Sequence, residues 1–135
     1  MITDLGHIAF TTGDLNEAIE FYCDLLGLEE AFRLKDDQGK LMLVYLKVGE
    51  DSFIELFPGR GEKTEGEKSE FGFRHFCLLV DDMEATVTKL RKNGVELERD
   101  PSRGKDGNLQ CWVRDPDGND VELMEINPNS PQARA

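Results

Sequence analysis

The chain has 135 residues, of which 39% are hydrophobic, and a formal net charge of −12. This length suits one domain with a modest core, and the negative charge argues against nucleic acid as a partner, because phosphate binding needs a basic surface. No apolar run is long enough to span a bilayer and no signal peptide opens the chain, so we expect a cytoplasmic protein with no membrane partner.

The first part of the chain predicts one helix among four strands. Leu5–Thr11 alternates as a strand does, and Asp14 can cap the helix that follows. Gly27 ends that helix. Its apolar side chains recur at helical spacing and predict an inner face made of Leu15, Ala18, Ile19, Tyr22, Leu25 and Leu26. Three more strands are expected at residues 33–35, 41–47 and 53–57.

A polar, glycine-rich stretch at residues 59–72 predicts a linker, and the same order of elements follows it. Asp82 can cap a second helix, which Asn93 and Gly94 end. The expected strands are 73–80, 95–98, 109–114 and 120–126, with a basic loop at 102–108. The tail, residues 127–135, has no periodic pattern and is expected to be frayed.

Equivalent residues of the two parts recur at nearly constant spacing. Glu55 and Glu122 are 122 − 55 = 67 residues apart, and His7 and His75 are 75 − 7 = 68 apart. The chain is therefore predicted to be a single α+β domain with an internal duplication, in which module 1–58 and module 73–126 each fold as βαβββ. Each module carries one His on its first strand and one Glu on its last.

These four residues are candidate metal ligands. Strand alternation places Glu55 on an apolar face beside Phe53 and Phe57, where a carboxylate needs a partner. A lysine or arginine is one possible partner, and either His alone could be an ordinary core residue. A divalent cation held by His7, Glu55, His75 and Glu122 would neutralise both carboxylates, and the duplication favours this interpretation. Two nitrogen and two oxygen donors suit Zn, Ni, Co, Mn or Fe.

Short motifs along nearly the whole chain match a known family. They are His7–Phe10, Gly13–Leu15, Ala18–Tyr22, Leu25–Leu28, Ile54–Leu56, Arg74–Phe76, Asp115–Gly118 and Val121–Leu123. In these motifs the chain resembles the vicinal-oxygen-chelate superfamily, which includes glyoxalase I, bleomycin-resistance proteins and extradiol dioxygenases. The resemblance implies two βαβββ modules that form a U-shaped mixed-sheet barrel around a metal, usually in a homodimer.

Within that superfamily the His-Glu-His-Glu set is similar to that of glyoxalase I, the lactoylglutathione lyase. The resemblance implies a metal-dependent lyase that isomerises a 2-oxoaldehyde–thiol hemithioacetal, or a related 2-hydroxycarbonyl, by proton transfer through a metal-bound enediolate. Glu122 would be the principal base and Glu55 its counterpart. The alternatives are an epimerase or dioxygenase on the same scaffold, or a non-catalytic drug-binding resistance protein.

The thiol cosubstrate is less well defined than the metal. Glutathione-using glyoxalases carry an Arg four residues after the first His, whereas this chain has Thr11 there, which is a candidate substrate-binding residue by its position. Arg60, Arg103 and Lys105 are candidates to bind the substrate in its place, and the alternative is that they are solvated loop charges. The cosubstrate is therefore glutathione, another thiol or none.

Overall fold

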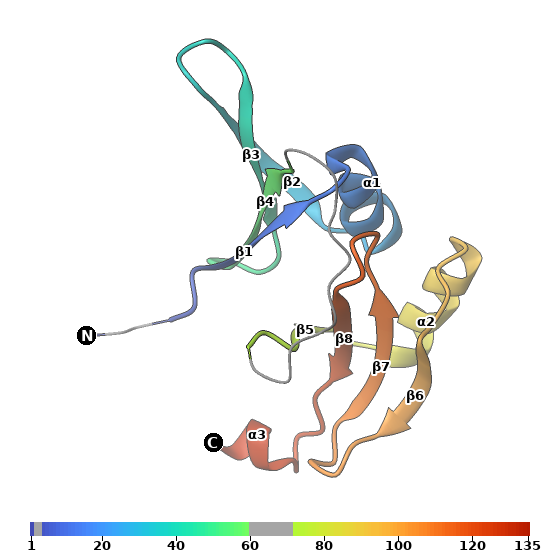
Figure 1. Ribbon diagram of the computed structural model, residues 1–135. Coiled ribbons are helices and arrows are strands. Elements are labelled where there is room, and N and C mark those ends of the chain that lie inside the picture. The colour runs from blue at the N-terminus through green and yellow to red at the C-terminus, as the bar shows by residue number, and fades with distance from the viewer. Residues whose placement is uncertain (2–3, 60–71) are drawn as a thin grey trace. The chain divides into compact units, whose positions relative to one another are not determined.

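The computed structural model describes Met1, residues 4–59 and residues 72–135 (Figure 1). The chain divides into two compact units, Met1–Lys68 and Ser69–Ala135. The first contains β1 (His7–Thr12), α1 (Leu15–Ile19), η1 (Glu20–Leu25), β2 (Glu29–Lys35), β3 (Leu41–Lys47) and β4 (Phe53–Pro58). The second contains β5 (His75–Leu79), α2 (Met83–Lys92), β6 (Arg99–Arg103), β7 (Leu109–Arg114), β8 (Asp120–Glu125) and α3 (Pro131–Arg134).

The two units have the same sheet topology. The strand order is β1-β4-β3-β2 in the first sheet and β5-β8-β7-β6 in the second. In each sheet the first strand of the unit runs parallel to the last, and the other neighbours are antiparallel. The predicted α+β class is confirmed, and the common topology agrees with the predicted duplication.

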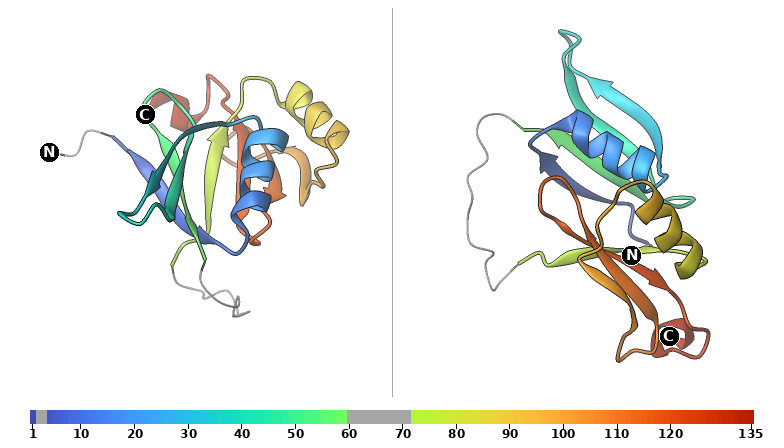
Figure 2. Two further views of the ribbon diagram at one scale, coloured as in Figure 1. Left: turned by 90° about the horizontal axis from the view of Figure 1, so that it is seen from above. Right: turned by 90° about the vertical axis from the view of Figure 1, so that its right-hand side faces the viewer.

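The core of each unit lies between one face of the sheet and a helix (Figure 2). On β4 the side chains of Ile54 and Leu56 are fully buried, and α1 packs against this strand. On β8 Val121 and Leu123 take the same positions, next to α2. Because successive residues of a strand point to opposite faces, the glutamate between each pair lies on the sheet face away from its helix.

The first helix departs from the prediction in its second half. Asp14 caps α1 as expected, but the following turn, η1, is π-helical, and the Leu26 backbone N–H donates to the Phe21 carbonyl (3.0 Å). A π-helical bond spans one more residue than an α-helical one, so the buried face shifts. As a result Phe21, which the helical spacing had not placed inside, is buried next to the predicted Tyr22.

The outermost strand of each sheet also differs from the prediction. The strand expected at residues 33–35 is the longer β2, and the strand expected at 95–98 is wrong, because β6 begins only at Arg99. Every residue of β2 and β6 is exposed, so neither strand carries the apolar alternation that marks a half-buried strand. Pro101 is tolerated in β6 because this edge strand is irregular between Arg99 and Ser102. The loop expected at 102–108 is correspondingly shorter.

The expectation of a frayed tail is wrong. The Asn127 backbone N–H donates to Asn108 Oδ1 (3.0 Å), and its side-chain amide donates to the Gly107 carbonyl (3.2 Å). Ser130, which is 2% exposed, caps α3 by accepting a hydrogen bond from the Ala133 backbone N–H (3.1 Å). All three are polar contacts, and those of Asn127 join residues far apart in the sequence, so hydrophobic periodicity does not reveal them. No helix in the described parts of the chain is long and apolar enough to cross a membrane.

The Asp14 cap gives a prediction for stability. Asp14 Oδ1 accepts hydrogen bonds from the backbone N–H groups of Asn16 (2.9 Å) and Glu17 (3.1 Å). Asp14→Ala leaves both groups without this acceptor, so we expect the free energy of unfolding to fall by about 1 kcal/mol in urea denaturation. Asp37→Ala, at an exposed turn position, is the control and should cost less than about 0.5 kcal/mol. Equal losses in the two variants would contradict a capping role.

Candidate functional site

The first unit brings His7 and Glu55 together. They lie on the neighbouring parallel strands β1 and β4, and His7 Nε2 is 3.3 Å from Glu55 Oε2. Glu55 is 9% exposed, whereas the His7 side chain is 46% exposed. Tyr45, directly opposite Glu55 on β3, makes an edge contact with the imidazole at 5.7 Å between ring centroids. The interaction of its hydroxyl with the Glu55 carboxylate raises the pKa of Tyr45.

The second unit repeats this arrangement with His75 and Glu122. They lie on the parallel neighbours β5 and β8, and His75 Nε2 is 3.1 Å from Glu122 Oε2. Glu122 is also 9% exposed. Trp112, opposite Glu122 on β7, makes an edge contact with the His75 ring at 4.7 Å. We call each His–Glu pair a half-site: His7 with Glu55, and His75 with Glu122.

The half-sites argue against the alternatives to a metal. Neither Glu55 nor Glu122 forms an ion pair with a lysine or arginine of the described residues, and each faces an imidazole instead. The His75 side chain is 36% exposed and that of His7 more, so neither is an ordinary core histidine. An imidazole lone pair and a carboxylate oxygen on adjacent strands are donors that a transition metal binds.

Each half-site holds two of the four predicted ligands. No group of three or more His, Cys, Asp or Glu side chains suited to a metal occurs within the described ranges. A complete four-ligand site therefore remains a prediction, since it requires a contribution from both units.

The second half-site opens onto a pocket of about 350 Å³. It is lined by Arg74, His75, Glu98, Arg99, Trp112, Arg114 and Asp120. The Arg114 guanidinium is neutralised by Glu98 (3.3 Å) and Asp120 (3.1 Å), whereas the Arg99 guanidinium lies over the Trp112 ring at 5.6 Å from its centroid. Neither Arg74 nor Arg99 forms a salt bridge with a carboxylate of the described residues. The pocket thus presents positive charge that no carboxylate of the described residues neutralises, in a chain whose net charge is −12.

Sequence reasoning did not assign Arg74, Arg99 or Arg114 to the site. Arg99 was missed because the strand that contains it was expected at residues 95–98. The positions of Arg74 and Arg114 could nevertheless have indicated a role in the site. Arg74 directly precedes His75, and Arg114 is two residues from Trp112 on the same strand. Residues two apart on a strand share a face, so Arg114 could have been placed beside the ring.

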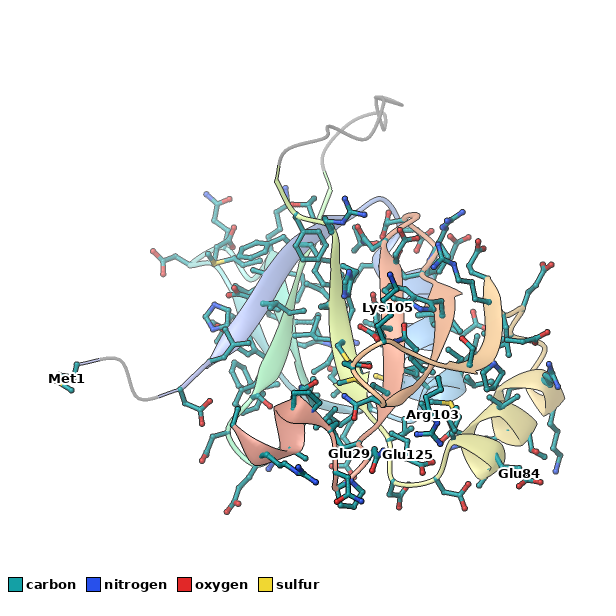
Figure 3. The ribbon with its side chains drawn as sticks, turned by 90° about the horizontal axis from the view of Figure 1, so that it is seen from below. Met1, Glu29, Glu84, Arg103, Lys105 and Glu125 are labelled. Carbon is teal, nitrogen blue, oxygen red and sulfur yellow. The ribbon has the colours of Figure 1, made fainter. Side chains whose placement is uncertain are left out.

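The predicted substrate-binding residues have different surroundings. Thr11 lines a pocket of about 450 Å³ in the first unit, together with Lys40, Leu41, Met42, Phe57, Pro58 and Gly59. Arg103 donates to the carbonyl oxygen of Gly107 in its own loop (2.6 Å), and Lys105 is exposed in that loop (Figure 3). Neither lines the pocket beside His75. Arg60 lies outside the described residues.

The thiols of Cys77 and Cys111, in the second unit, are not activated nucleophiles. Burial, with a smaller contribution from Glu122, raises the pKa of Cys77 to about 12. Burial is also the main cause that raises the pKa of Cys111 to about 11. Because the thiolate is the reactive form, both side chains are unreactive at neutral pH.

Comparison with known proteins identifies the family of this chain. A family model described as Glyoxalase/Bleomycin resistance protein/Dioxygenase superfamily matches residues 4–123. The chain is 35% identical over 128 residues to a probable lactoylglutathione lyase of Synechocystis sp., with 91% of this chain and 95% of the relative covered. It is 30% identical over 125 residues to a lactoylglutathione lyase of Salmonella typhimurium, with 90% and 91% covered.

A solved structure supports the same assignment. The trypanothione-dependent glyoxalase I of Leishmania major aligns with a TM-score of 0.71 and 26% identity, covering 92% of this chain and 87% of that one. The sequence match and the fold agree with the resemblance found in the short motifs. The chain therefore belongs to the Glyoxalase/Bleomycin resistance protein/Dioxygenase superfamily.

Proposed function

We propose that the chain is a metal-dependent lyase of the glyoxalase I type, which isomerises the hemithioacetal formed by a 2-oxoaldehyde and a thiol. The observation that carries this proposal is the recurrence of the half-site: a nine-tenths-buried glutamate facing an imidazole, at the same register in both sheets. The relatives named lactoylglutathione lyase support the same reaction class.

The donor set fits a divalent transition metal. A neutral imidazole leaves the charge of its buried glutamate uncompensated, and a cation shared by both half-sites would balance the two negative charges. In this proposal His7, Glu55, His75 and Glu122 hold the ion, and Zn, Ni, Co, Mn or Fe suits two nitrogen and two oxygen donors. When bound, such an ion supplies Lewis acidity, which polarises a carbonyl oxygen and makes the neighbouring C–H more acidic.

Glu122 is the proposed proton carrier. Its carboxylate takes the proton from the carbon that bears sulfur and hydroxyl, and returns it to the adjacent carbonyl carbon. The hydroxyl proton passes to the former carbonyl oxygen, so that the aldehyde-derived carbon becomes a thioester and its neighbour an alcohol. Both carbons belong to one substrate, and one carboxylate can serve as base and then as acid. The small exposed fraction of Glu122 favours this role, because exclusion of water limits loss of the proton to solvent.

The pocket beside His75 is the proposed site for an anionic part of the substrate. Among the residues that the structure describes, neither Arg74 nor Arg99 has a carboxylate partner there, and glutathione and related thiols carry carboxylates. Arg99 is held over the Trp112 ring, so its guanidinium is ordered before the substrate arrives. These arginines take the role that sequence reasoning gave to Arg103 and Lys105. The thiol is glutathione or a related one, and the Leishmania major relative is described as trypanothione-dependent.

Substitution of Glu122 tests the proposed chemistry. Glu122→Gln keeps the size of the side chain but removes the base, so we expect kcat to fall by about 10²–10⁴-fold in an assay of thioester formation from methylglyoxal and a thiol. Glu84→Gln, at an exposed position of α2, is the matched control and should keep wild-type kcat. Full activity of the folded Glu122→Gln protein would contradict the proposal.

Substitution of Arg99 tests the anion pocket. Arg99→Gln removes a charged contact made equally by substrate and transition state, so we expect KM to rise about 10–100-fold while kcat changes little. Arg91→Gln, which only breaks a surface pair with Asp100, should leave both constants unchanged. Arg99→Lys should restore part of the loss because it keeps the charge. An unchanged KM in Arg99→Gln would exclude this residue from substrate binding.

A further inference from the structure

The only tryptophan of the chain, Trp112, contacts two residues of the pocket beside the second half-site. Its ring meets the His75 ring edge-on at 4.7 Å between centroids, and the Arg99 guanidinium lies over it at 5.6 Å from its centroid. Arg99 is also the cross-strand neighbour of Trp112 on β6. The orientation of this one indole therefore decides which surface both side chains contact.

A hydrogen bond from Gln110 holds the indole. The Trp112 Nε1–H group donates to Gln110 Oε1 (3.2 Å). The two residues are two apart on β7, so their side chains share a face of the sheet. The N–H is the one polar group of a tryptophan side chain, and the ring has two broadly opposite orientations about its outer side-chain bond. An acceptor on one side of the ring selects one of them.

The Gln110 amide is in turn confined by the loop between β6 and β7. Gly104 packs so close to it that a side-chain carbon at this position would overlap Gln110 Nε2. The Gly104 N–H donates to the Asn108 carbonyl (2.9 Å), and the Gly107 N–H donates to the Gly104 carbonyl (3.0 Å). Asn127 of the tail binds Asn108 and Gly107. The tail thus secures the loop, and the loop confines the amide that faces the indole.

We propose that Gln110 is a positioning residue, which fixes the orientation of the Trp112 indole and thereby holds Arg99 in place for the anionic part of the substrate. This inference rests on the proposed function, because it uses the anion pocket assigned there. It goes further by giving a role in substrate binding to a neutral side chain that does not line the pocket. Gln110 acts on binding through the ring and the guanidinium above it.

The first test follows the indole directly. Gln110→Met removes the acceptor and keeps an unbranched side chain of similar length. A single tryptophan gives a single indole N–H signal in a proton–nitrogen correlation NMR spectrum. We expect this proton signal to move upfield and to exchange faster with water in the variant, because the hydrogen bond is lost. Gln38→Met, at an exposed turn position of the first unit, is the matched control and should leave the signal unchanged.

The second test measures the pocket with S-methylglutathione, a thioether that carries both carboxylates of glutathione and cannot form a hemithioacetal. We expect Gln110→Met to raise its Kd about two- to fivefold in calorimetric titration, which is the effect of one exposed cation–π contact. Arg99→Gln should raise the Kd about 10–100-fold. Adding Gln110→Met to the Arg99→Gln protein should then change the Kd no further, because residues that act through one contact are not additive.

The outcomes separate this inference from the proposed function. If S-methylglutathione does not bind the wild-type protein, or binds Arg99→Gln equally well, the proposed anion pocket is wrong and the role of Gln110 falls with it. If Arg99→Gln weakens binding but Gln110→Met does not, or if the two effects add, the pocket stands and the positioning role is overturned. An unchanged indole signal in Gln110→Met would overturn it too.

Neither measurement depends on turnover, so the lyase chemistry is tested separately by Glu122→Gln. Thermal unfolding of the Gln110 and Arg99 variants establishes that their folds are intact.

Discussion

A carboxylate that is largely removed from water beside a single imidazole is the constraint on which the rest of the structure depends. Glu55 and Glu122 are each 9% exposed and sit on an inner strand of a small sheet. Their neighbours Ile54 and Leu56 in one unit, and Val121 and Leu123 in the other, fix the register because they fill the core. A shift by one residue would exchange these apolar side chains with the glutamate, so core packing itself holds each carboxylate on the face away from the helix.

The burial of negative charge links the fold to its proposed chemistry. An isolated buried carboxylate is costly, and proteins offset this cost with a cation, a proton or hydrogen bonds. Here a tyrosine lies opposite the glutamate of the first unit, while the second unit has a tryptophan at that place and an arginine-lined pocket close to its histidine. The duplicated sheets therefore share a backbone arrangement and differ in the side chains around each glutamate.

Those parts of the fold that follow from hydrophobic periodicity were predictable from sequence. The inner strands β3, β4, β7 and β8 are short, mainly apolar runs, and β3 and β7 have the predicted bounds. The duplication predicted that His7 and His75 occupy equivalent places, and likewise Glu55 and Glu122, since residues at equal offsets are equivalent in a repeated fold. That each histidine lies beside the glutamate of its own unit follows from the parallel pairing of the first and last strands, which the structure shows.

The remaining parts depend on interactions that periodicity does not report. The edge strand β6 is polar throughout and contains Pro101, the turn η1 changes the helical period at Phe21, and Asn127 is tied down by a side chain 19 positions earlier. The position of Arg99 in the pocket was missed for the same reason, because the strand that contains it was not predicted at the right residues. Polar edge strands, and hydrogen bonds between residues far apart in the sequence, can be identified only from the three-dimensional pairing of the strands.

The most direct test of the account is the number of histidines bound to one metal ion. X-ray absorption at the metal edge of the Co²⁺-loaded protein distinguishes imidazole from carboxylate donors, because the imidazole ring scatters the photoelectron from its outer atoms as well. The account predicts two imidazoles and additional oxygen donors around each ion, with one ion per chain. One imidazole per ion, together with two bound ions per chain, would mean that each half-site binds its own ion. That result would contradict the shared site.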